Sequence, residues 1–164
     1  MTQSVAARMN PRSCEELAND NAREMLHSLS SAIHLRGDTH RIFHALTIPE
    51  FLEAWICIPC NEQDCRSRVE LSGESLAVRH ICPSGRKVSI FGDFIVRRRR
   101  RLLISWRTDG FSSSPRSQLT IRLCGAFEKT LLSLHHTGFR SEDEKAWHDA
   151  LWTSSLEKLN RLLC

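Results

Sequence analysis

The chain has 164 residues, of which 41% are hydrophobic and 26% are charged. This is the balance of a globular domain rather than of a disordered chain, and one domain of this length can bury a sizeable core without disulfides or metals. The net charge of +4 tolerates an anionic partner without requiring one. No apolar stretch is long enough to span a bilayer, and residues 1–12 lack the apolar core of a signal peptide. We therefore expect a cytoplasmic protein.

The start of the chain predicts a tail followed by one helix. Residues 1–12 show no regular pattern, whereas Ser13 and Glu16 have the spacing of a capping box before a loose apolar stripe that ends near Leu26. From residue 29 the hydrophobic period changes to two. We therefore divide the chain into residues 1–27, a tail with an extra helix, and residues 28–164, the main domain.

A strand and two short helices are expected next. Residues 29–36 alternate between apolar and polar positions, as in a strand. Asp38 or Thr39 can cap a short helix. Thr47 is followed by Pro49 and Glu50, which is the pattern of an N-cap for a second short helix.

Residues 68–137 predict six consecutive strands. They alternate in hydrophobicity and are separated by short turn signals, which favours an antiparallel meander over parallel strands with helical crossovers. The expected strands are 68–71, 75–82, 87–97, 102–108, 117–127 and 130–137.

The last segment predicts a long helix. Gly138 ends the preceding strand, and Ser141 with Glu144 forms another capping box. An apolar stripe then runs over about five turns, from His148 to Leu163. Because a helix cannot bury such a stripe alone, we expect it to pack on the inner face of the sheet.

Four stretches resemble one known family. Residues 45–55, ALTIPEFLEAW, resemble the ALT-x-PE-x-L-x-x-W signature of the START-like (SRPBCC) superfamily. Residues 92–96, 101–106 and 130–163 resemble its central strand, its R-L-V-x-T-W strand and its closing strand and helix. The chain is most similar to the branch named after the C-terminal domain of the activator of the heat-shock protein 90 ATPase.

The resemblance implies an α+β helix-grip fold, as in the birch-pollen allergens. In this fold a curved antiparallel seven-stranded sheet wraps around a long C-terminal helix, and two short helices follow the first strand. It also implies an apolar cavity between sheet and helix. Members of the superfamily bind apolar ligands there, and some catalyse cyclisation or hydrolysis. The eukaryotic activator carries a further chaperone-binding domain, for which this chain is too short.

Aromatic, histidine and apolar side chains are the candidates to line that cavity, with polar groups such as Arg122 or His136 to orient the ligand. His136 shares a strand face with Leu132 and Leu134, and His148 begins the helix stripe, so the two histidines are expected to meet at one end. Core packing is the alternative interpretation for these residues. The expected cavity residues are Trp55, Phe94, Trp106, Arg122, Leu134, His136, His148 and Trp152. No catalytic residue is predicted, because no local spacing forms a catalytic set.

Two further motifs have structural and functional interpretations. Arg97–Arg101 are five consecutive arginines; a phosphate-binding patch is one interpretation, and an exposed hairpin tip is the one we favour. Cys57, Cys60, Cys65 and Cys82 could supply four thiolates to zinc. Cys82, however, has no close partner in the sequence, and His80 would point the same way along the strand. We therefore expect free thiols and neither a metal site nor a cofactor.

The sequence thus favours a non-catalytic domain that binds a small apolar or amphipathic molecule, of fatty-acid or polyketide size. An enzyme of the cyclase or hydrolase type that uses a cavity histidine is one alternative. A chaperone-interacting domain is the other. Nucleic acid is not favoured as a partner, no membrane span is expected, and a homodimer stays open.

Overall fold

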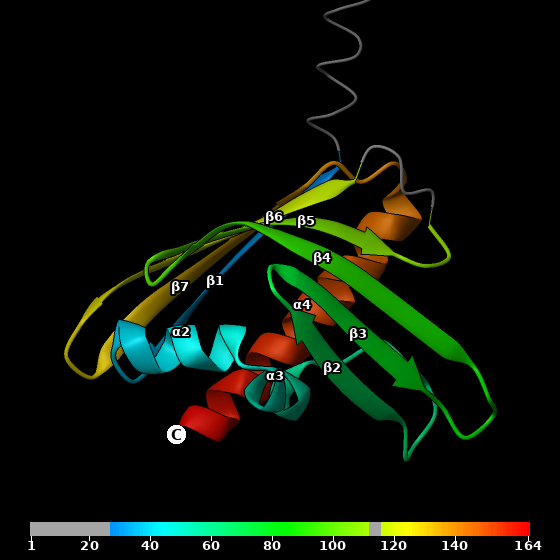
Figure 1. Ribbon diagram of the computed structural model, residues 1–164, viewed down its shortest axis with the longest axis horizontal. Coiled ribbons are helices and arrows are strands. Elements are labelled where there is room, and N and C mark those ends of the chain that lie inside the picture. Colours follow the sequence, from blue (N-terminus) through cyan, green and yellow to red (C-terminus); the bar gives the residue numbers. More distant parts are fainter. Residues whose placement is uncertain (1–26, 112–115) are drawn as a thin grey trace, which may run out of the picture.

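A computed structural model describes residues 27–111 and 116–164 of the chain. A single sheet of seven strands curves around the long C-terminal helix (Figure 1). All neighbouring strands are antiparallel, in the order β1-β7-β6-β5-β4-β3-β2. The elements are β1 (Ser28–Arg36), α2 (Thr39–Thr47), α3 (Pro49–Trp55), β2 (Arg66–Ser72), β3 (Ser75–Ile81), β4 (Lys87–Arg98), β5 (Arg101–Thr108), β6 (Ser117–Ala126), β7 (Lys129–Thr137) and α4 (Glu142–Leu163). The predicted fold and element order are confirmed.

The first strand, β1, pairs with the last strand, β7, at one end of the sheet. β1 pairs with β7 over its whole length, from Ser28 opposite Thr137 to Arg36 opposite Lys129. The first described segment is thereby joined to the hairpin that precedes α4. β2 is the free edge at the other end of the sheet. The predicted helix from Ser13 lies outside the described residues.

Helix caps follow the predictions in two cases and depart from them in one. Asp38 accepts a hydrogen bond from the Arg41 backbone N–H, and Ser141 Oγ accepts one from the Glu144 N–H. The predicted cap at Thr47 is wrong. Thr47 is instead the last residue of α2, and its hydroxyl donates to the Phe43 carbonyl. The N-cap of α3 is Ile48, which makes no side-chain cap hydrogen bond, and Pro49 lies in the first turn, where proline is favoured.

The core lies between the concave face of the sheet and α4, and α2 and α3 close it from the side (Figure 1). The inward faces of β4 to β7 supply Ile90, Ile104, Leu119 and Leu132. The predicted stripe of α4 supplies Trp152, Leu156, Leu159 and Leu163, which are all buried. Strand alternation and helix periodicity therefore converge on one apolar interior.

No helix in the described part of the chain combines the length and the apolar character needed to cross a membrane.

Candidate functional site

Three of the predicted cavity residues border one enclosed apolar space. Trp55 ends α3, Trp106 comes from β5 and Trp152 from α4, and the rings of Trp106 and Trp152 lie 5.3 Å apart. Trp55 is fixed by a 2.7 Å hydrogen bond from its Nε1 to the Ala45 carbonyl. The remaining lining is aliphatic and consists of Leu46, Leu52, Ile56, Leu76, Leu102, Ile104, Leu119 and Ile121.

This space is far smaller than expected. Its volume is about 20 Å³, whereas pockets for drug-sized ligands have roughly 300–1,000 Å³. The prediction of a space that receives a molecule of fatty-acid size is therefore wrong for this conformation. Three indole rings are among the side chains that border the remaining space.

His136 and His148 meet beside this space, as the sequence predicts. Both side chains are fully buried, and their ring centres lie 5.0 Å apart. The ring of Phe139 packs against both histidines, at 4.5 Å and 4.8 Å. Two neutral imidazoles can share such a dry site, whereas two charged ones would repel each other there.

Every ring nitrogen of the two histidines has a hydrogen-bond partner. Trp152 Nε1 donates to His136 Nδ1 at 3.1 Å, so the proton of His136 is on Nε2 and faces Ser117 Oγ at 2.9 Å. Ser117 Oγ in turn donates to the Trp106 carbonyl at 3.2 Å. His136 is therefore the middle of a chain that joins α4 to β6 and β5.

His148 has the opposite tautomer. Its Nδ1 lies 2.8 Å from the Glu144 carbonyl, which can only accept, so the proton is on Nδ1. Its Nε2 accepts from Thr108 Oγ1 at 3.0 Å, and Thr108 Oγ1 also receives a hydrogen bond from Trp106 Nε1 at 3.2 Å. The network is complete, which is the condition under which buried polar groups are tolerated.

Burial keeps both imidazoles neutral. Burial lowers the pKa of His136 well below the ordinary value of 6.5, and His148 adds to this effect. Burial also lowers the pKa of His148 to about 4, against a smaller opposing effect of its hydrogen bond to Glu144. At neutral pH neither ring is an imidazolium that could act as a general acid. The acceptor nitrogen of each ring already accepts a hydrogen bond, so neither ring has a free lone pair for general-base catalysis.

The sequence did not single out the partners of these histidines, Thr108 and Ser117. Strand alternation was the available signal for Thr108, because it shares the face of Trp106 and is buried. The same signal existed for Ser117, because the predicted strand 117–127 places it on the face of Leu119 and Ile121. A buried hydroxyl beside an imidazole becomes visible only when the strands are aligned.

The other predicted cavity residues lie elsewhere. Phe94 and Leu134 are buried in the core, and the Arg97 guanidinium stacks over the Phe94 ring at 5.1 Å. The placement of Arg122 in the cavity is wrong. Arg122 lies between the buried Ile121 and Leu123, so alternation directs it to the outer face of the sheet, where it lines an open groove of about 560 Å³.

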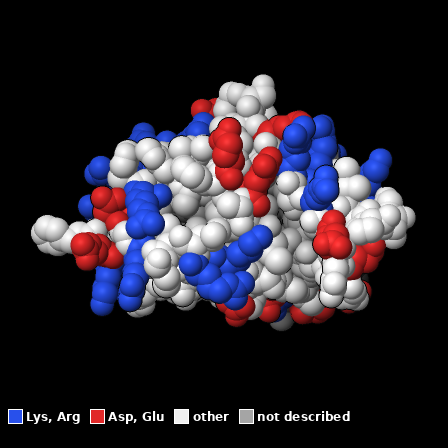
Figure 2. Space-filling model, turned by 90° about the horizontal axis from the view of Figure 1, so that it is seen from below, with Lys and Arg blue, Asp and Glu red and all other residues white. Residues whose placement is uncertain are grey.

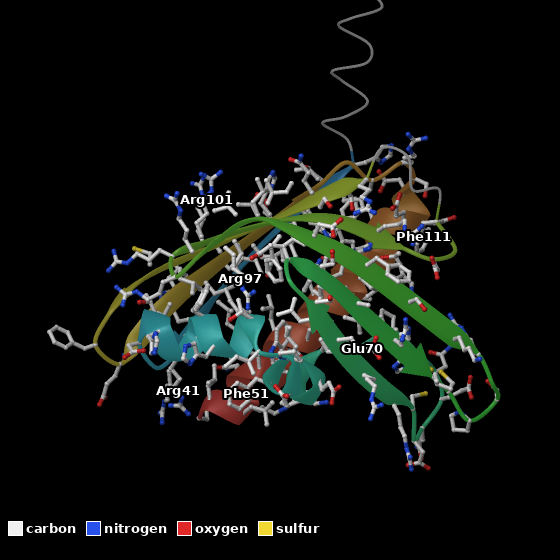
Figure 3. All side chains as sticks on the ribbon, viewed as in Figure 1. Arg41, Phe51, Glu70, Arg97, Arg101 and Phe111 are labelled. Atoms are coloured by element: carbon white, nitrogen blue, oxygen red, sulfur yellow. The ribbon has the colours of Figure 1, made fainter. Side chains whose placement is uncertain are left out.

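The arginine run forms the predicted hairpin tip, between β4 and β5. Arg97 differs from its neighbours, because it lies between the sheet and α2 and donates to the Thr47 carbonyl at 3.3 Å (Figure 3). Arg98, Arg99, Arg100 and Arg101 are exposed, and Figure 3 shows Arg101 pointing outward.

The argument from spacing against a metal site is also wrong. The loop of residues 56–65 folds back so that Cys60 Sγ lies 3.1 Å from Cys82 Sγ and 3.3 Å from Cys65 Sγ. Cys82 therefore has the close thiol partners that its place in the sequence did not indicate. Cys57 is separate from this group, and its backbone N–H donates to Ser155 on α4.

The fold has many solved counterparts. A structure from Chromobacterium violaceum has a TM-score of 0.69 at 19% identity, covering 84% of this chain and 97% of that one. One from Rhodobacter sphaeroides has a TM-score of 0.68 at 18% identity, with 84% and 91% covered. One from Mycobacterium smegmatis has a TM-score of 0.66 at 13% identity, with 86% and 93% covered. At these identities the likeness shows the fold alone.

The sequence itself points to one family. No curated protein sequence matches the chain significantly. The family model described as "Activator of Hsp90 ATPase homolog 1-like protein" matches residues 38–164, from the cap of α2 to the end of α4. The chain therefore belongs to the family of activator of Hsp90 ATPase homolog 1-like proteins.

Proposed function

We propose that the domain is a non-catalytic binding module that takes up a compact apolar molecule between the sheet and α4. The observation that supports this most directly is the enclosed space bordered by Trp55, Trp106 and Trp152, whose lining is apolar throughout. Dry apolar cavities in proteins bind small apolar molecules once they are large enough. Because this space is small, α3 and α4 must move apart as the ligand enters.

The two buried histidines favour binding over catalysis. A general base needs a free lone pair within reach of a substrate. The nitrogens of His136 and His148 are instead paired with Ser117, Trp152, Thr108 and the Glu144 carbonyl. Their role in this proposal is to close the polar end of the core.

Enlarging the space tests the proposal. Leu102 lines the space and is 1% exposed, whereas Leu132 is equally buried but does not line it. We expect Leu102→Ala to bind benzene at least about tenfold more tightly than the wild type, a gain of about 1.4 kcal/mol. The reason is that less side-chain movement is then needed to admit the ligand. Displacement of an apolar fluorescent dye measures the affinity.

Leu132→Ala is the matched control for this experiment. Both substitutions remove the same atoms from the core and should lower stability by about 2–5 kcal/mol. Only Leu102→Ala should change the affinity for benzene. Equal binding by the two variants would show that the response reflects general loosening of the core and would contradict the proposal.

A protein partner is the second candidate, and the exposed arginine hairpin favours it. Arg98, Arg99, Arg100 and Arg101 form a basic group next to the exposed Ile95, and the 89% exposed Phe127 lies at the neighbouring β6–β7 turn. Figure 2 views the molecule from below and shows Lys and Arg side chains in several separate groups, at both ends and in the middle of this face. Basic residues beside exposed apolar ones are typical of a contact with an acidic protein surface.

Charge reversal separates this candidate from the first. An Arg98→Glu, Arg99→Glu variant should weaken binding to a purified Hsp90 chaperone by at least about tenfold. The control is Arg66→Glu, Arg68→Glu, which changes the charge equally on exposed positions of β2. Calorimetric titration measures both. Equal affinities for the two variants, or no binding by the wild type, would contradict a contact through the hairpin.

A further inference from the structure

The loop of residues 56–65 and the end of β3 bring three thiols and one imidazole together at the edge of the sheet. Cys60 and Cys65 come from the loop, and His80 and Cys82 come from β3 and the residue that follows it. One ligand atom from each of the four residues lies within 4.8 Å of the others. Cys60 Sγ is in contact with the sulfurs of both Cys65 and Cys82, and a shared ligand would account for this grouping.

His80 is prepared to act as a ligand. Its Nδ1 lies 2.9 Å from Ser67 Oγ, which orients the ring. Its Nε2 is buried and has no hydrogen-bond partner among the described residues, and the residue as a whole is 6% exposed. A buried ring nitrogen without a partner is costly unless something binds it. Metal-binding histidines commonly have this arrangement, with one nitrogen oriented by a neighbour and the other on the metal.

The geometry fits a tetrahedral cation. Zn–S bonds of about 2.3 Å place two sulfurs about 3.8 Å apart in a tetrahedral site. The observed separations of 3.1 Å and 3.3 Å need to open by only about 0.5–0.7 Å to reach this value. Thiolates and imidazole together select zinc over magnesium or calcium, which prefer oxygen ligands.

We propose that Cys60, Cys65, His80 and Cys82 form a structural zinc site. Zinc replaces the protons of the three thiols, and these protons pass to solvent. With three thiolates and a neutral imidazole, the filled site has one net negative charge, and Lys158 on α4 lines the same cleft. All four positions are filled by the protein, as in structural rather than catalytic zinc sites.

A second contact holds the same loop in place. Glu62 accepts hydrogen bonds from Ser84 N at 3.1 Å and from Ser84 Oγ at 2.7 Å, and these bonds fasten the loop to the β3–β4 turn. Glu53 on α3 accepts from the Val69 N–H at 2.7 Å and so anchors β2. These hydrogen bonds already hold the loop and β2 at the free edge of the sheet. The zinc ion would add a further link between the loop and β3.

Metal analysis of the full-length chain tests the proposal. The protein is refolded without metal under reducing conditions and titrated with zinc alone, and bound zinc is counted after desalting. We expect one zinc per chain. Cobalt in place of zinc should give the absorption bands of a tetrahedral site and a thiolate-to-metal band whose intensity corresponds to three thiolates.

Substitutions assign the ligands. Cys65→Ser changes a half-buried loop residue and should abolish stoichiometric binding, while circular dichroism checks that the sheet is intact. Cys57→Ser is the control, because Cys57 lines the same cleft without belonging to the cluster, and it should keep one zinc. Ser67→Ala should keep the stoichiometry but weaken zinc binding about tenfold or more, as loss of an orienting partner does.

Three outcomes would overturn the proposal. The first is a wild-type chain that retains no zinc. The second is equal loss of zinc in Cys57→Ser and Cys65→Ser, which would place the metal elsewhere. The third is a Cys60–Cys82 disulfide in the protein as isolated, found by mass spectrometry without reductant, because such a bond would remove two ligands.

Discussion

His136 and His148 show at the residue scale why this core holds polar side chains. Each imidazole is fixed in one tautomer by a group that can act in only one way, the indole N–H of Trp152 for His136 and the carbonyl of Glu144 for His148. Removing one member would leave its partner buried and unpaired, at a cost of about 1–3 kcal/mol. The network therefore fixes the position of α4 on the sheet in a way that apolar contacts alone do not.

The lowered pKa of His148 predicts a loss of stability in acid. The unfolded chain takes up a proton near pH 6.5, whereas the folded chain resists it until about pH 4. The contribution of His148 is therefore fully present above pH 6.5 and is lost as the pH falls, by up to about 3 kcal/mol. His136 acts in the same direction. Urea unfolding at a series of pH values measures the effect.

His148→Gln should reduce the pH dependence of the unfolding free energy between pH 6.5 and 5, because glutamine does not titrate. The exposed His34 provides the control, and His34→Gln should keep the wild-type slope. The slope is informative even though His148→Gln lowers stability at every pH. An unchanged slope in His148→Gln would mean that this imidazole is accessible to protons in the folded state.

At the scale of elements, the N-cap of α4 is the clearest local signal for the start of a helix. Ser141 Oγ accepts from the Glu144 N–H, and the Glu144 carboxylate accepts from the Arg140 N–H at 2.8 Å. We expect Ser141→Ala to lower the free energy of unfolding by about 1 kcal/mol. Ser154→Ala, at an exposed position inside the same helix, is the control and should change it by less than about 0.5 kcal/mol. Thermal and urea unfolding distinguish them, and equal effects would contradict a specific capping role.

Hydrophobic patterns within a single segment were enough to predict the strands and the C-terminal helix. Alternation placed the seven strands, and the stripe from His148 to Leu163 placed α4 on the sheet. Alternation also indicated that Arg122 faces outward, although we expected it in the cavity as a polar group that orients the ligand. Predictions fail where two distant segments meet. Neither the volume between the tryptophans nor the contact of Cys60 with Cys82 depends on local spacing.

At the scale of the whole molecule, the sheet is held differently at its two ends. At the β1 end, strand pairing with β7 continues the sheet into the hairpin before α4. At the β2 end, the edge is fastened by side chains, through Glu53, Glu62 and the cluster that we propose binds zinc. The apolar space lies between these ends, against α3 and α4. Ligand entry therefore requires the helices to move while both ends of the sheet stay fixed.

Titration of the wild-type chain with benzene, followed by NMR of its methyl groups, tests the central claim most directly. The account predicts saturable shifts, and contacts between benzene and protein, at methyl groups that line the space, such as those of Leu102, Ile104 and Ile121. The exposed Ile95, on the outer face of β4, should stay unchanged. Shifts confined to exposed methyl groups, or no saturable shift at the lining groups, would contradict a binding site between the sheet and α4.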